Sequence, residues 1–142
     1  MQGDVEEPTE VLDNFIKRMG LTYEVTLKSA EDGTWTYLVR FRSGDGKVLD
    51  LTYEDFDENP KSQVARDALD EAASDAACVE NSSNLWEWCN EYYGLEPHNP
   101  IIPDPEATYL IQRRRAKDLK EFVGDKDYAA LLYGVERLYE TD

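Results

Sequence analysis

The sequence predicts an α+β fold: an N-terminal helix, a three-stranded antiparallel β-meander, and then four helices ending in an antiparallel helical hairpin. Two patterns indicate this order. Apolar residues recur at helical spacing in residues 9–19 and again from residue 61 onward, whereas residues 21–53 alternate between apolar and polar side chains. With 142 residues, of which 41% are hydrophobic, the chain is long and apolar enough for one domain spanning residues 1–142.

The first helix is predicted to begin at Thr9, a residue type that caps helices, and to end at Gly20. Residues 1–8, which precede it, are interpreted as a frayed acidic leader. The predicted strands are LTYEVTLK, TWTYLVRFR and VLDLTY, joined by turns at SAEDG and SGDGK. We expect one face of this sheet to pack on helices and the other to carry cross-strand ion pairs.

A long helix should follow Asn59 and Pro60, which combine a capping residue with a proline in the first turn. Its apolar positions form a narrow, alanine-rich stripe that lets a neighbouring helix or sheet approach closely: Val64, Ala65, Ala68, Leu69, Ala72, Ala76 and Val79. The opposite side carries an acidic face at positions i, i+3, i+4 and i+8, formed by Asp67, Asp70, Glu71 and Asp75.

The next helix, LWEWCNEYY, is predicted to be capped by Ser83 or Asn84 and to end at Gly94. Its inner face should consist of Leu85, Trp88, Cys89 and Tyr92. Trp86 and Tyr93 are then left at the outer rim as candidate contact residues. A proline-rich loop follows over residues 95–105, and we expect its Ile101 and Ile102 to pack onto the core.

The fourth helix is predicted to begin at Asp104 and Pro105 and to end at Gly124. Its expected inner positions are Leu110, Ile111, Arg115, Leu119, Phe122 and Val123. The run from Arg113 to Arg115 suits either a phosphate site or pairing with carboxylates of the same chain, and we favour pairing in so acidic a protein. A last amphipathic helix should start after its cap at Asp125.

Negative charge is concentrated in residues 54–106. This segment holds fourteen carboxylates and two basic side chains, a net charge of 2 − 14 = −12 out of −16 for the whole chain. Self-repulsion on this scale destabilises a compact fold, so the charge serves either a solvated surface or a basic partner. The same charge argues against direct binding of nucleic acid or of an anionic membrane.

No motif for a cofactor, a metal or a catalytic centre is found, so we expect neither an enzyme nor a bound cofactor. The run EDFDEN is similar to a calcium loop, but Pro60 replaces the required glycine and Arg66 the bidentate glutamate. The single histidine, His98, has no cysteine pair nearby for zinc. With no signal peptide and no membrane span, we expect a cytoplasmic protein in which Cys78 and Cys89 stay reduced.

Two blocks, DALDEAASDAACVENSSNLWEWCNEYYG and FVGDKDYAALLYGVERLYE, resemble the matching segments of a family of small phage and prophage accessory proteins. The resemblance covers most of residues 34–140, but the loop at 95–105 departs from the shorter, charged connection that is commoner in the family. It implies no catalytic activity. It does imply a small cytosolic protein of a mobile element, and such elements often encode acidic inhibitors of host restriction or CRISPR defence.

We therefore hypothesise an inhibitor of a host nucleic-acid-binding defence complex that acts as an acidic DNA mimic and occludes a basic groove. The expected partner-binding residues are Asp67, Asp70, Glu71, Asp75, Glu80, Glu87, Glu91, Trp86 and Tyr93. The alternative is a phage adaptor that binds a protein through its aromatic rim, with acidity serving solubility. A homodimer would extend a charged surface, but the sequence does not indicate an oligomeric state.

Overall fold

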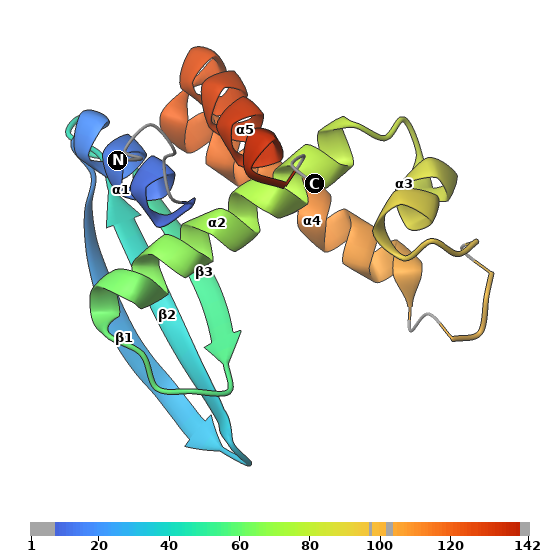
Figure 1. Ribbon diagram of the computed structural model, residues 1–142, viewed down its shortest axis with the longest axis horizontal. Coiled ribbons are helices and arrows are strands. Elements are labelled where there is room, and N and C mark those ends of the chain that lie inside the picture. Colours follow the sequence, from blue (N-terminus) through green and yellow to red (C-terminus); the bar gives the residue numbers. More distant parts are fainter. Residues whose placement is uncertain (1–7, 97, 102–103, 140–142) are drawn as a thin grey trace, which may run out of the picture.

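The computed structural model describes residues 8–96, 98–101 and 104–139. Its elements follow the predicted order and confirm the α+β fold class (Figure 1). They are α1 (Pro8–Arg18), β1 (Thr22–Glu31), β2 (Thr34–Arg42), β3 (Val48–Asp55), α2 (Lys61–Glu80), α3 (Leu85–Tyr92), α4 (Pro105–Val123) and α5 (Asp125–Tyr139). The predicted leader lies outside the described residues except for Pro8, which is the first residue of α1.

The sheet is antiparallel, with strand order β1-β2-β3. Val25, Val39 and Leu51 lie opposite one another across the three strands, so alternate residues share a face, as the sequence pattern predicts. On that face the side chains of β2 and β3 are more deeply buried than those of β1. The register of β1 against β2 shifts between Leu27 and Ser29, which leaves Lys28 as an extra residue in β1.

The other face of the sheet carries the predicted cross-strand ion pairs. Nε and Nη2 of Arg40 donate to the two carboxylate oxygens of Asp50 at 2.7 and 2.9 Å. This bidentate bond holds the pKa of Asp50 below its ordinary value. A looser pair joins Arg42 and Glu24 at 3.7 Å. The two pairs tie β2 to both of its neighbours.

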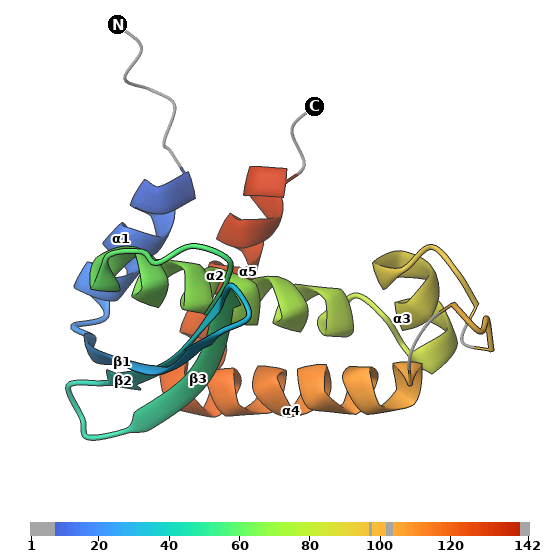
Figure 2. The ribbon, with the colours of Figure 1, turned by 90° about the horizontal axis from the view of Figure 1, so that it is seen from below.

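Helix α2 lies across one face of the sheet and runs alongside α4 (Figures 1 and 2). All seven predicted apolar positions are buried, and Ala73 and Ala77 are buried as well, so the apolar stripe is wider than predicted. The predicted cap at Asn59 is wrong, because Pro60 occupies the N-cap position without a side-chain bond. The side-chain amide of Asn59 (Nδ2) instead donates to Oδ2 of Asp55, the last residue of β3, at 2.7 Å.

Two predicted core positions of α4 are also wrong. Leu110 and Ile111 are 55% and 58% exposed, and Tyr109 and Gln112 are buried in their place. The first half of the helix therefore turns a different side inward than predicted, whereas the predicted Leu119, Phe122 and Val123 are buried. Gln112 can be buried because it accepts a hydrogen bond from Trp88 Nε1 at 2.9 Å. The N-cap at Asp104 is confirmed, since its side chain accepts from the backbone of Ala107.

In the proline-rich loop, Ile101 is 77% exposed, so the expectation that it packs onto the core is wrong. Ile102 lies outside the described residues.

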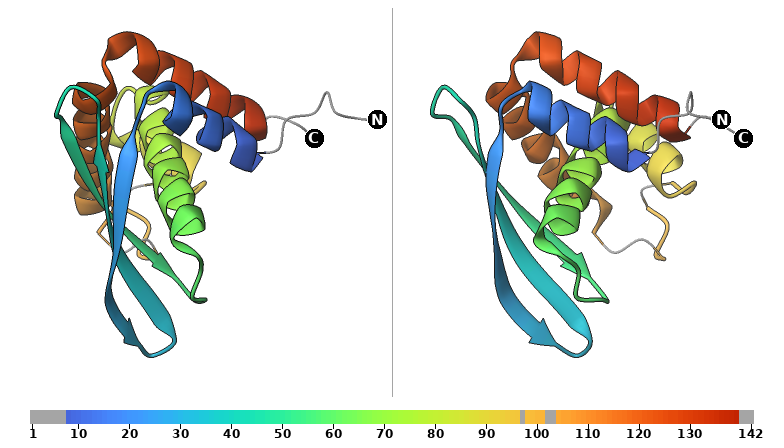
Figure 3. Two further views of the ribbon diagram at one scale, coloured as in Figure 1. Left: turned by 90° about the vertical axis from the view of Figure 1, so that its left-hand side faces the viewer. Right: turned by 60° about the vertical axis from the view of Figure 1, so that its left-hand side comes forward.

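The buried residues form two clusters. The larger one lies between the sheet, α2 and the helices that pack beside α2, and α1 runs next to α5 over it (Figure 3). The smaller one holds Val79, Trp88, Cys89 and Tyr109, and it attaches α3 to the end of α2 that is remote from the sheet. Cys78 and Cys89 are free thiols, and burial raises the pKa of Cys78 to about 11. No helix among the described residues is long and apolar enough to cross a membrane.

Candidate partner-binding surfaces

The predicted partner-binding residues fall into three places rather than one. One group lies along the middle of α2 and consists of Asp67, Asp70, Glu71 and Asp75. Trp86, Glu87, Glu91 and Tyr93 lie on or directly after α3, beyond the far end of α2 (Figure 2). Glu80, the last residue of α2, faces a separate cleft beside α4. The structure thus offers three separate candidate surfaces: along α2, around α3, and in the cleft beside α4.

Asp75 is occupied by an internal ion pair. Its Oδ2 lies 2.6 Å from Nη1 of Arg115, and Glu71 Oε1 lies 3.6 Å from the same nitrogen. The side chains of Arg115 and Asp75 are only 26% and 12% exposed. The predicted pairing of this arginine within the chain is confirmed, and Asp75 serves to join α2 to α4.

The other carboxylates of α2 lie close to two carboxylates at the end of β3, Glu54 and Asp55. Burial raises the pKa of Asp67, and the nearby carboxylates of Asp70 and Asp55 raise it further against the opposing effect of Arg66. Burial also raises the pKa of Glu71, where Arg115 lowers it and Asp75, Glu54 and Asp70 raise it. These mutual effects place carboxylates of both elements close together. We call the group the acidic surface: Glu54, Asp55, Asp67, Asp70 and Glu71.

Phe56 is an aromatic side chain that the sequence analysis missed. It is 82% exposed in the turn that follows β3, next to the acidic surface. Its backbone N–H donates to Asp55 Oδ1 at 2.7 Å, so the start of the turn is held to the end of the strand. The exposed carboxylates of Asp57 and Glu58 follow it. The sequence could have indicated this residue, because Phe56 is the one apolar residue within the run EDFDEN.

A second candidate surface surrounds α3. Trp86 is half exposed, and together with Asn81, Glu87, Asn90 and Glu91 it lines an open hollow of about 590 Å³. Three of the predicted contact residues are thus brought together here.

Two of the predicted contact residues near α3 have structural roles. Tyr93 is half-buried, and its ring packs edge-on against Trp88 with 5.7 Å between centroids. The Glu87 side chain accepts from the backbone N–H of Ser83 at 3.1 Å, and the Glu87 N–H donates to Asn84 Oδ1 at 3.0 Å, so Glu87 takes part in capping the start of α3. Asn84 is therefore the cap of α3, one of the two predicted alternatives.

The raised pKa values on α2 predict an unusual dependence of stability on pH. For Asp67, Glu71 and Asp75, burial raises the pKa above the ordinary values of 3.8, 4.5 and 3.8. The folded protein therefore holds these protons to a higher pH than the unfolded chain does. We expect the free energy of unfolding to increase as the pH falls from about 7 to about 4.5, close to the ordinary pKa values of these groups.

Urea denaturation at the two pH values measures this effect. Asp45 and Asp50 have lowered pKa values, so they oppose the gain only below 3.8. The variant D67N/E71Q should have a smaller pH dependence than the wild type. E31Q/E121Q, which removes two exposed carboxylates elsewhere, should retain it. Equal pH dependence in both variants would show that the net charge of the chain controls stability instead.

No protein-family model matches the chain, and neither a curated protein nor a solved structure matches it.

Proposed function

We propose that this protein inhibits a host nucleic-acid-binding defence complex, of the CRISPR or restriction kind, by occupying the groove in which that complex binds phosphates. The observation that carries this proposal is the convergence of carboxylates from β3 and α2 into the acidic surface. The protein acts by steric and electrostatic occlusion, without turnover.

The spacing of charge on α2 is comparable with that of DNA. Asp67, Asp70 and Glu71 lie within about 6 Å along the helix axis, at a rise of about 1.5 Å per residue. Duplex DNA carries one negative charge per roughly 1.7 Å, so the same length holds about three to four phosphates. A groove of lysine and arginine side chains that neutralises DNA is therefore attracted by this stretch of helix.

Phe56 adds an apolar contact at the border of the acidic surface. Charge complementarity mainly speeds association and selects the partner, whereas buried aromatic side chains supply much of the binding energy at protein interfaces. An exposed phenylalanine surrounded by Asp55, Asp57 and Glu58 has little role in the core of this fold. We assign it the role of an anchor in a pocket next to the basic groove.

The alternative is an adaptor that binds a phage or host protein through α3, and the hollow around Trp86 favours it. An interface built on Trp86 would depend on apolar contact area and would respond weakly to salt. Binding by the acidic surface would weaken steeply between low and high salt.

The test compares two variants of equal charge. E54K/D57K/E58K reverses three exposed carboxylates beside Phe56, and E31K/E106K/E121K reverses three exposed carboxylates elsewhere. Both change the net charge from −16 to −16 + 6 = −10. Each protein is produced in a bacterium with an active CRISPR or restriction system, and phage plating efficiency is measured. Tagged protein is also used to capture partners from the same cells at about 50 mM and about 500 mM salt.

We expect the wild type and E31K/E106K/E121K to restore phage plating and to capture a nucleic-acid-binding complex at low salt only. E54K/D57K/E58K should lose both activities. Capture that persists at high salt and is lost in W86A would establish the adaptor instead. Equal plating with all three proteins would refute the proposed contact of the groove with Glu54 and the carboxylates beside Phe56.

A further inference from the structure

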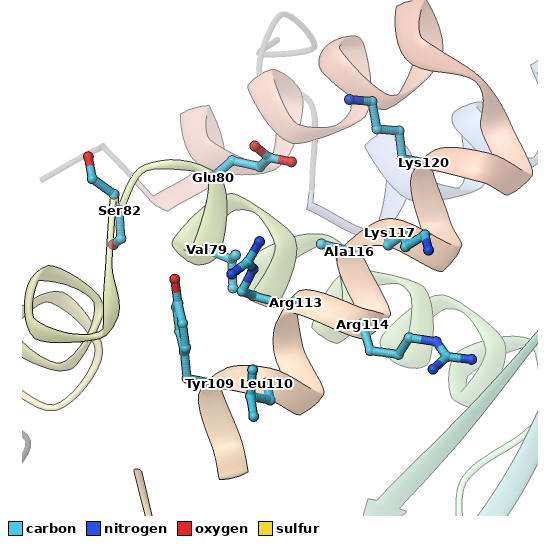
Figure 4. Close-up of a pocket in the computed structure, with 11 residues that line it drawn as sticks. Val79, Glu80, Ser82, Tyr109, Leu110, Arg113, Arg114, Ala116, Lys117 and Lys120 are labelled. Carbon is cyan, nitrogen blue, oxygen red and sulfur yellow. The ribbon is translucent and has the colours of Figure 1, made fainter. Parts of the chain in front are cut away.

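The cleft between the end of α2 and α4 is a basic feature in an otherwise acidic protein. It has a volume of about 570 Å³, within the range of small-molecule sites. Its lining includes four basic side chains and one carboxylate, a local charge of 4 − 1 = +3 against −16 for the chain. Arg113, Lys117 and Lys120 project from α4 at positions i, i+4 and i+7, the spacing of one helix face, and Arg114 lies next to them at a different angle (Figure 4).

Three of these basic groups, Arg113, Lys117 and Lys120, have no acidic partner among the described residues. The neighbouring Arg115, by contrast, is held by Asp75. The Arg113 guanidinium lies over the ring of Tyr109, 5.7 Å from its centroid, and Figure 4 shows it reaching toward Val79 at the end of α2. What distinguishes these cations is that three of them lie in one cleft, which makes the cleft attractive to an anionic ligand in a protein with twice as many acidic as basic residues.

The cleft also has an apolar wall and a fixed acceptor. Leu110, 55% exposed, lies beside Tyr109 in the lining, and Val79 and Ala116 continue this wall. Glu80 is held on the other side, where Tyr128 OH donates to its Oε2 at 2.8 Å. The cations suit a phosphate, the apolar wall suits a ring, and the carboxylate can accept hydrogen bonds from hydroxyl groups. One class of molecule combines these three parts.

We propose that this cleft binds a nucleoside phosphate. Arg113 and Lys117 bind the phosphate, the base lies against Leu110, and Glu80 accepts from the sugar hydroxyls. The site is separate from the acidic surface, and the proposal does not depend on the inhibitory function proposed above.

Amide chemical shifts of the ¹⁵N-labelled full chain test this assignment. The probes are AMP, GMP, CMP and UMP, each titrated to about 5 mM, with inorganic phosphate and the four matching nucleosides as the two halves of each monophosphate. At least one monophosphate should give saturable shifts at residues 79–83 and 109–120, and it should bind more tightly than inorganic phosphate or its own nucleoside. No saturable shifts in these segments with any monophosphate, or a nucleoside binding as tightly as its monophosphate, would overturn the proposal.

Matched variants separate a specific site from general charge. R113Q/K117Q and K28Q/K61Q each remove two positive charges, giving −16 − 2 = −18, but the second pair is exposed on β1 and α2. R113Q/K117Q should weaken binding at least about tenfold, and K28Q/K61Q less than about twofold. Equal weakening would overturn the site. The oligonucleotide dT8 is a last probe, and binding more than about tenfold tighter than that of any monophosphate would assign the cleft to single-stranded nucleic acid instead.

Discussion

Replacing Trp88 with alanine should lower the free energy of unfolding by about 3–5 kcal/mol, the largest effect that we expect from a single substitution. Its indole is fully buried between Tyr93 and Tyr109, with ring centroids 5.7 and 5.3 Å away. Its Nε1 also donates to the buried Gln112, so the variant leaves both a cavity and an unpaired amide oxygen. Urea denaturation followed by circular dichroism measures the loss.

Trp86 provides the control, because it is the same residue type two positions earlier and is half exposed. W86A should cost less than about 1 kcal/mol. In W88F most of the ring volume remains but the hydrogen bond is lost, so the expected cost is about 1–3 kcal/mol. If W88A and W86A destabilised the protein equally, the smaller core cluster would contribute little to global stability.

Replacing Arg115 with methionine should lower the free energy of unfolding by about 2–3 kcal/mol, somewhat less than for a fully buried ion pair because the arginine is 26% exposed. The substitution keeps an unbranched apolar stem but leaves Asp75 charged at 12% exposure, facing α4. The pKa of Asp75, already raised by burial, should then rise further. Urea denaturation gives the stability change, and NMR titration of the carboxylate gives the pKa.

The adjacent Arg114 is the matched control. It is exposed, and among the described residues it pairs only with Asp118, one turn further along the same helix, at 3.4 Å. R114M should therefore cost less than about 0.5 kcal/mol. The double variant D75L/R115M removes both charges and should recover most of the stability lost in R115M. A double variant as unstable as R115M would mean that packing of the arginine stem, and not the stranded carboxylate, causes the loss.

The order and type of the elements could be predicted from the sequence because the patterns there are local. Alternation in residues 21–53 and the alanine-rich stripe of α2 each follow from a single period. The inner positions in the second half of α4, Leu119, Phe122 and Val123, were predicted in the same way, but those in its first half were not. Leu110 and Ile111 are more apolar than Tyr109 and Gln112, but Gln112 is buried because Trp88, 24 residues away, satisfies its amide.

The candidate sites were predictable only as lists of residues. The acidic face of α2 could be read from its spacing, but its junction with Glu54 and Asp55 depends on how α2 lies on the sheet. The same applies to Asp75, which the sequence placed with the contact residues and the structure places against Arg115, 40 residues away. The basic cleft was not predicted, although Lys117 and Lys120 continue the arginine run at helical spacing.

The extra residue Lys28 in β1 has a consequence for the behaviour of the protein at high concentration. Edge strands present unpaired backbone N–H and C=O groups, on which a strand of another molecule can align. β1 is ten residues long and lies at the edge of the sheet, but its irregular register interrupts the regular array that such alignment requires. A second strand that aligned with β1 would also remove water from the charged side chain of Lys28, which disfavours the contact. We therefore expect the bulge to oppose the alignment of a second strand along β1.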